Sequence, residues 1–227
     1  MTRMVCLVLF LYVYVINVSA VALAAGTEHV QATTQPSSTT KVILFFGDSL
    51  TAGYGLDPDQ AFPAVIQAKI NTRGWDFRVI NAGLSGETTA GGLRRIAWVL
   101  QRPIAVLVLA LGANDALRGL PIAEARHNLQ AIIDRTKQKY PQVKIVLAGM
   151  QAPTNLGQDY TSSFRTLFPA LATANDAALI PFLLAGVGGI PALNLPDGIH
   201  PTPAGHRIIA ENVWKILEPL LQSLQEP

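Results

Sequence analysis

The strongest limit on the fold of this chain is the alternation of short apolar runs with longer helical patterns. The apolar runs, which are the expected strands, span residues 42–46, 77–81, 105–109, 144–148 and, more weakly, 179–182. The expected helices span residues 61–71, 89–100, 122–139, 161–178 and 203–224. Strands that are apolar on both faces belong in a covered sheet, and strand–helix alternation requires parallel crossovers. The sequence therefore predicts an α/β fold, a three-layer αβα sandwich with about five parallel strands.

The composition is typical of one globular domain preceded by a short N-terminal segment. The chain has 227 residues, of which 50% are hydrophobic and only 14% are charged, so a large core can be buried. It contains no internal repeat and no second composition regime, and we expect a single domain over residues 41–227. The formal net charge of +2 comes without a run of basic residues, which gives no reason to expect nucleic acid or an acidic membrane surface as a partner.

The first 25 residues have the pattern of a secretory signal peptide. Arg3 precedes an apolar stretch over residues 5–18, and Ala20 and Ala24 end two acceptable small-residue cleavage triplets. We therefore expect export to the periplasm or the exterior, with retention as an N-terminal membrane anchor as the alternative. Residues 26–40 are rich in Thr and Ser and are expected to form a flexible lead-in.

Polar residues gather just after three of the expected strands and ahead of the last helix. The segments are 47–49, 81–88, 111–115 and 197–201. Each alone is weak evidence, because Gly, Asn, Asp and Ser are ordinary turn residues. Ligands of open α/β sheets bind at the carboxyl ends of the strands, however, so their joint position predicts a site there.

Ser49 is the candidate nucleophile, because it closely follows the first expected strand. A serine hydroxyl needs a base to take its proton, and a histidine oriented by a carboxylate is the usual base. His200 has Asp197 three residues earlier in a Gly-containing turn, so the carboxylate can reach Nδ1 while Nε2 faces outward. The other histidines of the mature chain fit the lead-in, a solvated helix face and the packing or surface of the last helix: His29, His127 and His206. Cys6, the only cysteine, lies in the signal segment, so the mature chain has neither a disulfide nor a cysteine nucleophile.

Acyl transfer also needs hydrogen-bond donors for the oxyanion, each worth about 3–4 kcal/mol of the barrier. Gly86 can offer a backbone N–H without a side chain in the way, and Asn114 carries a side-chain amide. The backbone N–H of Ser49, at an expected helix start, is a third candidate. Taken separately, Gly86 and Asn114 fit ordinary loop positions better than a catalytic role.

Four sequence blocks give the chain a resemblance to a known family. GDSL at 47–50, Gly86, GAND at 112–115 and DGIH at 197–200 resemble the four blocks of the GDSL, or SGNH, hydrolases, in the family's order. The surrounding residues look most like its branch of secreted arylesterases and multifunctional acyl-CoA thioesterase–lysophospholipases. The resemblance implies a flavodoxin-like SGNH hydrolase fold, whereas the G-x-S-x-G elbow of ordinary α/β-hydrolases is missing from the sequence.

The resemblance also implies a role for each matching residue. Ser49 is then the nucleophile, His200 the general base and acid, and Asp197 the orienting carboxylate. Ser49, Gly86 and Asn114 form the oxyanion hole, with neither metal nor cofactor. The expected activity is hydrolysis of aryl or short- to medium-chain acyl esters, acyl-CoA and lysophospholipid, by a monomer or weak dimer.

The substrate side of the site is less specific in the sequence. The family resemblance places a substrate-gating loop at residues 114–121, including Arg118. The apolar candidates for an acyl pocket are Leu117, Leu120, Met150, Leu156, Phe164 and Leu193. Ordinary core or loop packing is the competing interpretation of these side chains.

Three other functions remain open from the sequence. A carbohydrate O-acetylesterase would use the same scaffold and the same catalytic residues. A receiver- or phosphatase-like domain would react at Asp48 with a divalent cation, for which Asp115 is the evident helper; as a member of the resembled family, the chain would instead use Asp48 to support the turn. An inactive lipid- or glycan-binding module is the third alternative.

Overall fold

The computed structural model describes residues 40–225. The predicted signal peptide lies outside the described residues, as does all of the predicted lead-in except Thr40. Among residues 40–225, every helix is too short or too polar to span a bilayer.

Five parallel strands form one sheet in the order β2-β1-β3-β4-β5. Their bounds are β1 Lys41–Gly47, β2 Phe77–Gly83, β3 Val106–Ala110, β4 Lys144–Ala148 and β5 Ala178–Ile180. The predicted parallel sheet is confirmed, with each strand within a few residues of its expected place. The weak fifth strand is shorter than expected, because the chain turns away at Pro181.

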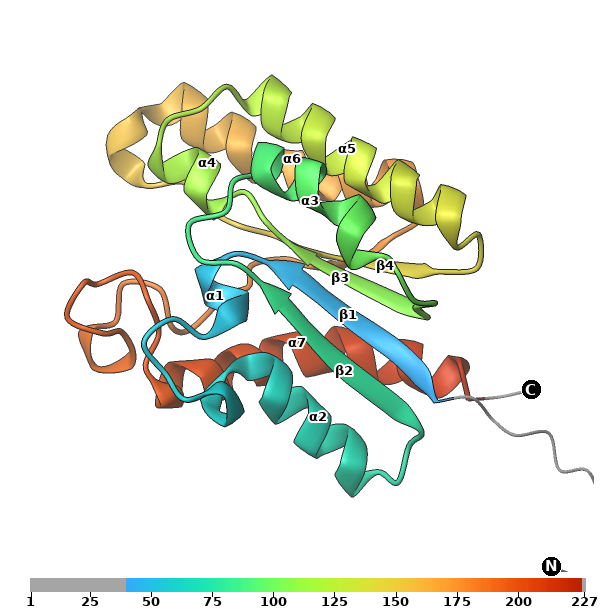
Figure 1. Ribbon diagram of the computed structural model, residues 1–227. Coiled ribbons are helices and arrows are strands. Elements are labelled where there is room, and N and C mark those ends of the chain that lie inside the picture. Colours follow the sequence, from blue (N-terminus) through green and yellow to red (C-terminus); the bar gives the residue numbers. More distant parts are fainter. Residues whose placement is uncertain (1–39, 226–227) are drawn as a thin grey trace, which may run out of the picture. The chain divides into compact units, whose positions relative to one another are not determined.

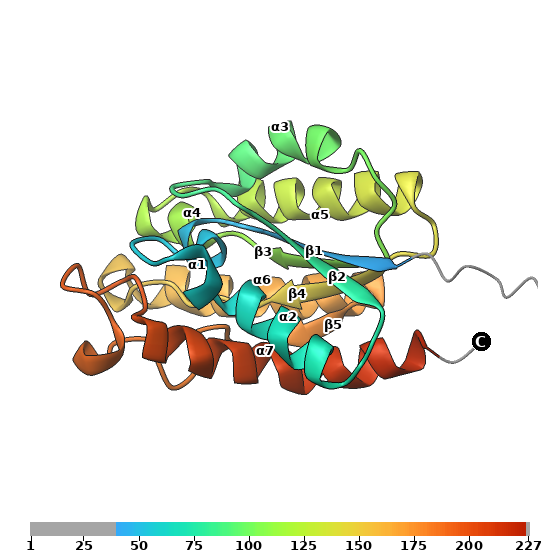
Figure 2. The same ribbon diagram turned by 60° about the horizontal axis from the view of Figure 1, so that its bottom comes forward.

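Helices cover both faces of the sheet, so the predicted three-layer sandwich is confirmed (Figures 1 and 2). One face carries α2 (Phe62–Thr72) and α7 (Pro203–Ser223). The other carries α3 (Thr89–Val99), α5 (Ile122–Lys139) and α6 (Gln158–Asn175). Buried side chains of β1 and β3 form the middle of the core, as their unbroken apolar sequence predicts.

The chain also contains short helical turns that periodicity does not predict. They are α1 (Ser49–Ala52), α4 (Ala113–Leu117) and the 3₁₀ turns η1 (Pro58–Gln60), η2 (Thr154–Leu156) and η3 (Pro191–Leu193). Helix α6 lies three residues earlier than predicted at both ends; it starts after Gly157, and it stops at Asn175 because Asp176 takes a left-handed conformation (φ 49°).

The strand order reverses direction at β1. From β1 the chain passes through α2 to β2 on one face, and from β2 through α3 to β3 on the other (Figure 1). The carboxyl end of β1 is therefore the topological switch point, where ligands bind in sheets of this kind. The register places Gly47 of β1 level with Gly83 of β2 and Ala110 of β3, so the segments after the three strands leave the sheet side by side.

Candidate active site

Helix α1 holds Ser49 at the switch point. The Asp48 carboxylate caps this helix by accepting the Leu50 N–H at 3.0 Å. Asn81 on β2 donates its side-chain amide to the Thr51 carbonyl at 2.9 Å. A Cβ at Gly83 would lie 2.2 Å from the Ala52 nitrogen, so only glycine lets α1 rest directly on the end of β2. The serine is thereby fixed by the strands on which its helix sits.

The side chains of Ser49, His200 and Asp197 are joined in a line by hydrogen bonds. The Ser49 Oγ lies 2.9 Å from the His200 Nε2, and the His200 Nδ1 lies 2.7 Å from the Asp197 Oδ2. The ring of Tyr54 packs against the His200 ring with centroids 4.3 Å apart. Ser49 is 8% exposed and lines a cavity, so its side chain can be reached from that cavity.

A tight turn holds Asp197 against His200. The second carboxylate oxygen of Asp197 accepts the backbone N–H groups of Ile199 and His200, each at 3.0 Å. Gly198 permits the turn by taking a φ of 75°. The bonds from the His200 N–H and ring, followed by that from the Ile199 N–H, lower the pKa of Asp197 to about 2. The carboxylate is therefore ionised throughout the neutral range and holds the imidazole through Nδ1.

Asn114 and Gly86 line the same cavity as Ser49 and His200. Gly112 leaves β3 with a φ of 118° and starts α4, which carries Asn114. The neighbouring Asp115 is buried and accepts both the backbone N–H and the hydroxyl of Thr89, at 2.8 and 2.6 Å. That pairing fastens α4 to the start of α3. Gly86 has a φ of 79°, a conformation that side chains disfavour.

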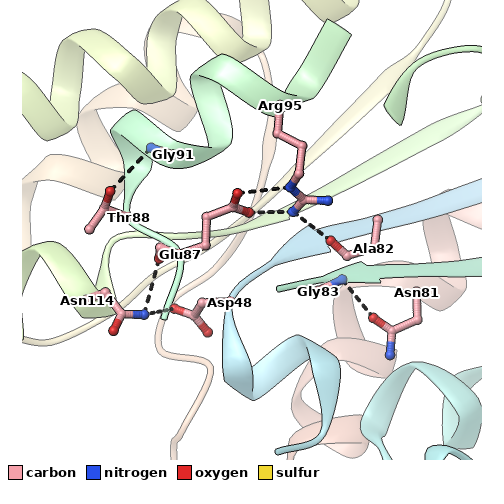
Figure 3. A network of polar contacts seen from close by, with 9 residues as sticks. All are labelled: Asp48, Asn81, Ala82, Gly83, Glu87, Thr88, Gly91, Arg95 and Asn114. Atoms are coloured by element: carbon pink, nitrogen blue, oxygen red, sulfur yellow. Dashed lines mark hydrogen bonds and ion pairs between the residues drawn. The ribbon is translucent and has the colours of Figure 1, made fainter. Parts of the chain in front are cut away.

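A polar network fixes the Asn114 amide (Figure 3). Its nitrogen donates to the Glu87 carbonyl at 3.1 Å and faces an Asp48 carboxylate oxygen at 3.4 Å. The Glu87 side chain is in turn bound by Arg95, whose Nε donates to it at 2.9 Å. Arg95 also donates to the Ala82 carbonyl at 2.9 Å and lies over the Phe46 ring. The longer contact with Asp48 is the weaker of the two amide bonds, so this hydrogen of Asn114 is the one that can be redirected.

Asp48 is a buried acid. Burial raises its pKa to about 7, against the Leu50 N–H bond, the nearby His200 charge and the Asn114 amide, which lower it. Its side chain caps α1 and has no exposed face, which is the turn-supporting position that the family resemblance implies.

The cavity in front of Ser49 has a volume of about 450 Å³. Its polar end holds Ser49, Gly86, Asn114 and His200. Large apolar side chains make up much of the remaining wall: Tyr54, Leu117, Met150, Phe182, Leu184 and Ile199. The arrangement suits an apolar chain attached to a polar, reactive group.

The predicted substrate residues divide into two groups. Leu117 and Met150 line the cavity as predicted, whereas the others do not: Arg118, Leu120, Leu156, Phe164 and Leu193. Phe164 packs in the core against Phe168. The Arg118 side chain turns the other way and donates to the Gly86 carbonyl at 3.0 Å. The residue type alone does not reveal the direction in which a side chain points, so the sequence could not separate the cavity residues from the others.

The other histidines do not join the site. His127 is exposed on α5, as predicted. His206 is buried on α7, where its Nδ1 accepts the Phe62 N–H at 3.1 Å. Burial, with a smaller effect of the His200 charge, lowers the pKa of His206 to about 4. His29 lies outside the described residues.

Sequence reasoning missed Tyr54 and most of the wall between Phe182 and Ile199. Tyr54 follows Ser49 by five residues, and this proximity is the one signal that could have indicated it. The segment from Phe182 to Ile199 has no periodic pattern. Asn194 fixes it in place by donating to the carbonyls of Val187 and Ile190, at 2.8 and 2.9 Å.

The chain is similar to a known protein family and to several individual proteins. Residues 45–208 match the GDSL-like lipase/acylhydrolase family. Over 182 residues, 80% of this chain and 90% of the relative, it is 40% identical to esterase TesA of Pseudomonas aeruginosa. It is 34% identical over 181 residues to thioesterase 1/protease 1/lysophospholipase L1 of Escherichia coli, covering 79% of this chain and 84% of the relative. The crystal structure of the psychrotrophic esterase EstA from Pseudoalteromonas sp., inhibited by monoethylphosphonate, superposes with a TM-score of 0.75 at 30% identity, covering 80% of this chain and 99% of that one.

Proposed function

Because the chain belongs to the GDSL-like lipase/acylhydrolase family, we propose that it hydrolyses carboxylic esters and thioesters through an acyl-enzyme on Ser49. The observation that carries the proposal is the hydrogen-bonded line from Ser49 through His200 to Asp197, at 2.9 and 2.7 Å. Relatives named esterase and thioesterase/lysophospholipase support both substrate types.

Acylation begins at the Ser49 hydroxyl. The His200 Nε2 takes the proton as the oxygen attacks the substrate carbonyl carbon. Asp197 stays ionised and stabilises the imidazolium through Nδ1. The tetrahedral intermediate then collapses, and His200 returns the proton to the departing alcohol or thiol. Water, activated by the same nitrogen, hydrolyses the acyl-enzyme and releases the acid.

The negative charge of the intermediate needs donors on the side of Ser49 opposite His200. The backbone N–H groups of Ser49 and Gly86 and the amide of Asn114 are assigned this role. Ser49 begins α1, and the first N–H groups of a helix have no partner within it. The Asn114 hydrogen that faces Asp48 at 3.4 Å turns to the substrate oxygen, while the bond to Glu87 keeps the amide in place.

The cavity supports an acyl group as the part of the substrate that is buried. Several large apolar side chains line the space in front of Ser49. A carbohydrate O-acetylesterase would place only an acetyl group there and leave most of the apolar cavity unfilled, so hydrolysis of esters and thioesters with longer acyl groups is favoured. A phosphatase-like reaction at Asp48 is disfavoured, because this carboxyl is fully buried and occupied as a helix cap.

The location and assembly of the enzyme belong to the same proposal. The N-terminal sequence pattern, which lies outside the described residues, supports export to the periplasm or the exterior. The substrate is a small acyl ester or thioester, and the expected assembly is a monomer or weak dimer.

Replacing the nucleophile tests the function directly. Ser49→Ala removes the attacking oxygen and is expected to lower kcat on p-nitrophenyl esters by at least about 10⁴-fold. The matched control is Ser163→Ala, which removes an exposed hydroxyl on α6 and should leave turnover unchanged. Wild-type turnover by Ser49→Ala would refute the proposal, as would failure of Ser49 to be labelled by a fluorophosphonate probe.

A further inference from the structure

A second groove adjoins the active-site cavity. It is lined by residues 84–88 of the loop after β2 and by Gly91, Arg94 and Arg95 of α3, together with Arg118 after α4. Its volume is about 530 Å³, and it shares Ser85 and Gly86 with the acyl cavity. A substrate whose acyl chain fills the cavity can therefore extend its remaining part across Gly86 into this groove.

The groove carries excess positive charge. Arg95 is neutralised there by its ion pair with Glu87. Arg94 and Arg118 form no ion pair with a carboxylate anywhere in residues 40–225. Both are exposed, and both line the groove. Two uncompensated guanidinium groups facing one concave surface suit a phosphate, whose oxygens accept paired N–H bonds.

Arg118 also connects the groove to the reaction centre. Its Nη2 donates to the Gly86 carbonyl at 3.0 Å, and the N–H of the same residue is assigned to the oxyanion hole. Gly86 is therefore the single residue between Arg118 and the oxyanion hole. A phosphate bound to Arg118 would lie close to the substrate carbonyl oxygen.

We propose that the groove between α3 and the end of α4 binds a phosphate group on the alcohol or thiol side of the substrate, through Arg94 and Arg118. This inference rests on the proposed esterase function and names its preferred leaving group. The shared chemistry is a phosphate, carried either by the headgroup of a lysophospholipid or by coenzyme A.

Matched substrate pairs with one acyl chain test the proposal. The first pair is octanoyl-glycerol phosphate and octanoyl glycerol, and the second is octanoyl-CoA and octanoyl-pantetheine. The measured quantity is the ratio of kcat/KM between the phosphate-bearing and neutral members of each pair. We expect Arg94→Gln with Arg118→Gln to lower this ratio at least about tenfold, because charge-assisted hydrogen bonds are lost. The matched control is Arg126→Gln, which removes an exposed arginine on α5 outside the groove.

The two pairs distinguish the sources of the phosphate. A fall in the glycerol pair alone assigns the groove to a lipid headgroup, and a fall in the thioester pair alone assigns it to coenzyme A. Arg94→Gln by itself keeps the test valid if loss of the Arg118–Gly86 bond disturbs folding or the neutral reaction. Unchanged ratios in both pairs, with hydrolysis intact, would overturn the groove assignment alone. Loss of the proposed function would appear separately, as wild-type enzyme that fails to hydrolyse either neutral substrate.

Discussion

The Asp197 carboxylate accepts two backbone N–H groups through one oxygen and meets the His200 ring through the other. Because the backbone bonds come from the same turn that carries His200, the carboxylate and the ring are positioned together. In an asparagine at this position, an NH₂ group would replace the carboxylate oxygen that faces the His200 Nδ1. That group would donate a hydrogen bond to Nδ1 instead of accepting one from it. The imidazole would then favour the tautomer that cannot accept the serine proton.

Asp197→Asn is therefore expected to lower kcat by about 10³–10⁴-fold with little change in KM. Steady-state hydrolysis of a p-nitrophenyl ester measures both constants. Asp59→Asn, at an exposed position of η1, is the control for loss of one carboxylate. Activity of Asp197→Asn within tenfold of wild type would show that His200 needs no orienting carboxylate.

The residues assigned a chemical role could be found from the sequence where a suitable residue type lies at the end of an expected strand or in a turn. Asp197 and His200 lie in a turn, and Ser49 and Asn114 lie in short helices that directly follow strand ends, so these polar side chains are not needed for packing in the core. Tyr54 could not be predicted, because an aromatic residue in a loop fits surface packing equally well. The family resemblance places Arg118 in a gating loop, whereas in the structure its side chain bonds to Gly86 and lines the groove. Its direction depends on the fold.

Helix α1 has four residues, too few to be stable alone. It persists because Asp48 caps it, Asn81 holds its carbonyl and Gly83 allows its backbone to lie against β2. The residue types at the ends of β1 and β2 therefore determine whether the helix that carries Ser49 can form.

Gly83→Ala tests this packing between elements. The added methyl group would lie 2.2 Å from a backbone nitrogen of α1, so α1 must shift. We expect a loss of about 1–3 kcal/mol of unfolding free energy, together with a marked fall in kcat. Gly188→Ala is the control for stability, because its methyl group would make only ordinary contact at 3.5 Å. Chemical denaturation measures the first effect, and an unchanged unfolding free energy for Gly83→Ala would contradict the packing argument.

The long elements could be predicted from periodicity, and the short ones could not. Helix α5 follows a regular apolar pattern, and its predicted bounds match the structure. Helices α1 and α4 have no room for a periodic signal, because they are four and five residues long. Both depend on contacts with neighbouring elements, which a local pattern does not contain.

At the scale of the fold, His206 links α7 to α2 by accepting the N–H of Phe62 at the start of α2. Since burial lowers its pKa to about 4, the folded protein disfavours protonation of this ring. Its contribution to stability is full above about pH 6.5 and is lost as the pH falls toward 4. The contribution of Asp48 to stability depends on pH in the opposite direction. Because its pKa is raised to about 7, it stabilises the folded state at low pH, and this stabilisation is lost as the pH rises through 7.

His206→Gln separates these two effects. The Gln side chain keeps an acceptor for the Phe62 N–H but cannot take up a proton in this range. The stability advantage of wild type over His206→Gln should fall by about 2–3 kcal/mol between pH 7 and pH 4.5. Denaturant unfolding across that range measures it, with His127→Gln on the exposed face of α5 as the matched control. A difference that does not change with pH would refute the assigned role of His206.

The strands β1, β2 and β3 end at the same level of the sheet. This alignment limits the sequence changes that the site can tolerate. Deleting one residue from β2 would shift Gly86 along the strand direction by about 3.3 Å. The residues on one side of the deletion would then point to the opposite face of the sheet. Most substitutions within the strands change packing locally, and those at Asn81 and Gly83 also act on α1, whereas a change in strand length would move whole segments relative to Ser49. In related sequences, insertions and deletions should therefore occur at the opposite edge of the sheet, in segments 73–76, 101–105 and 140–143. The lengths of the strands should stay the same.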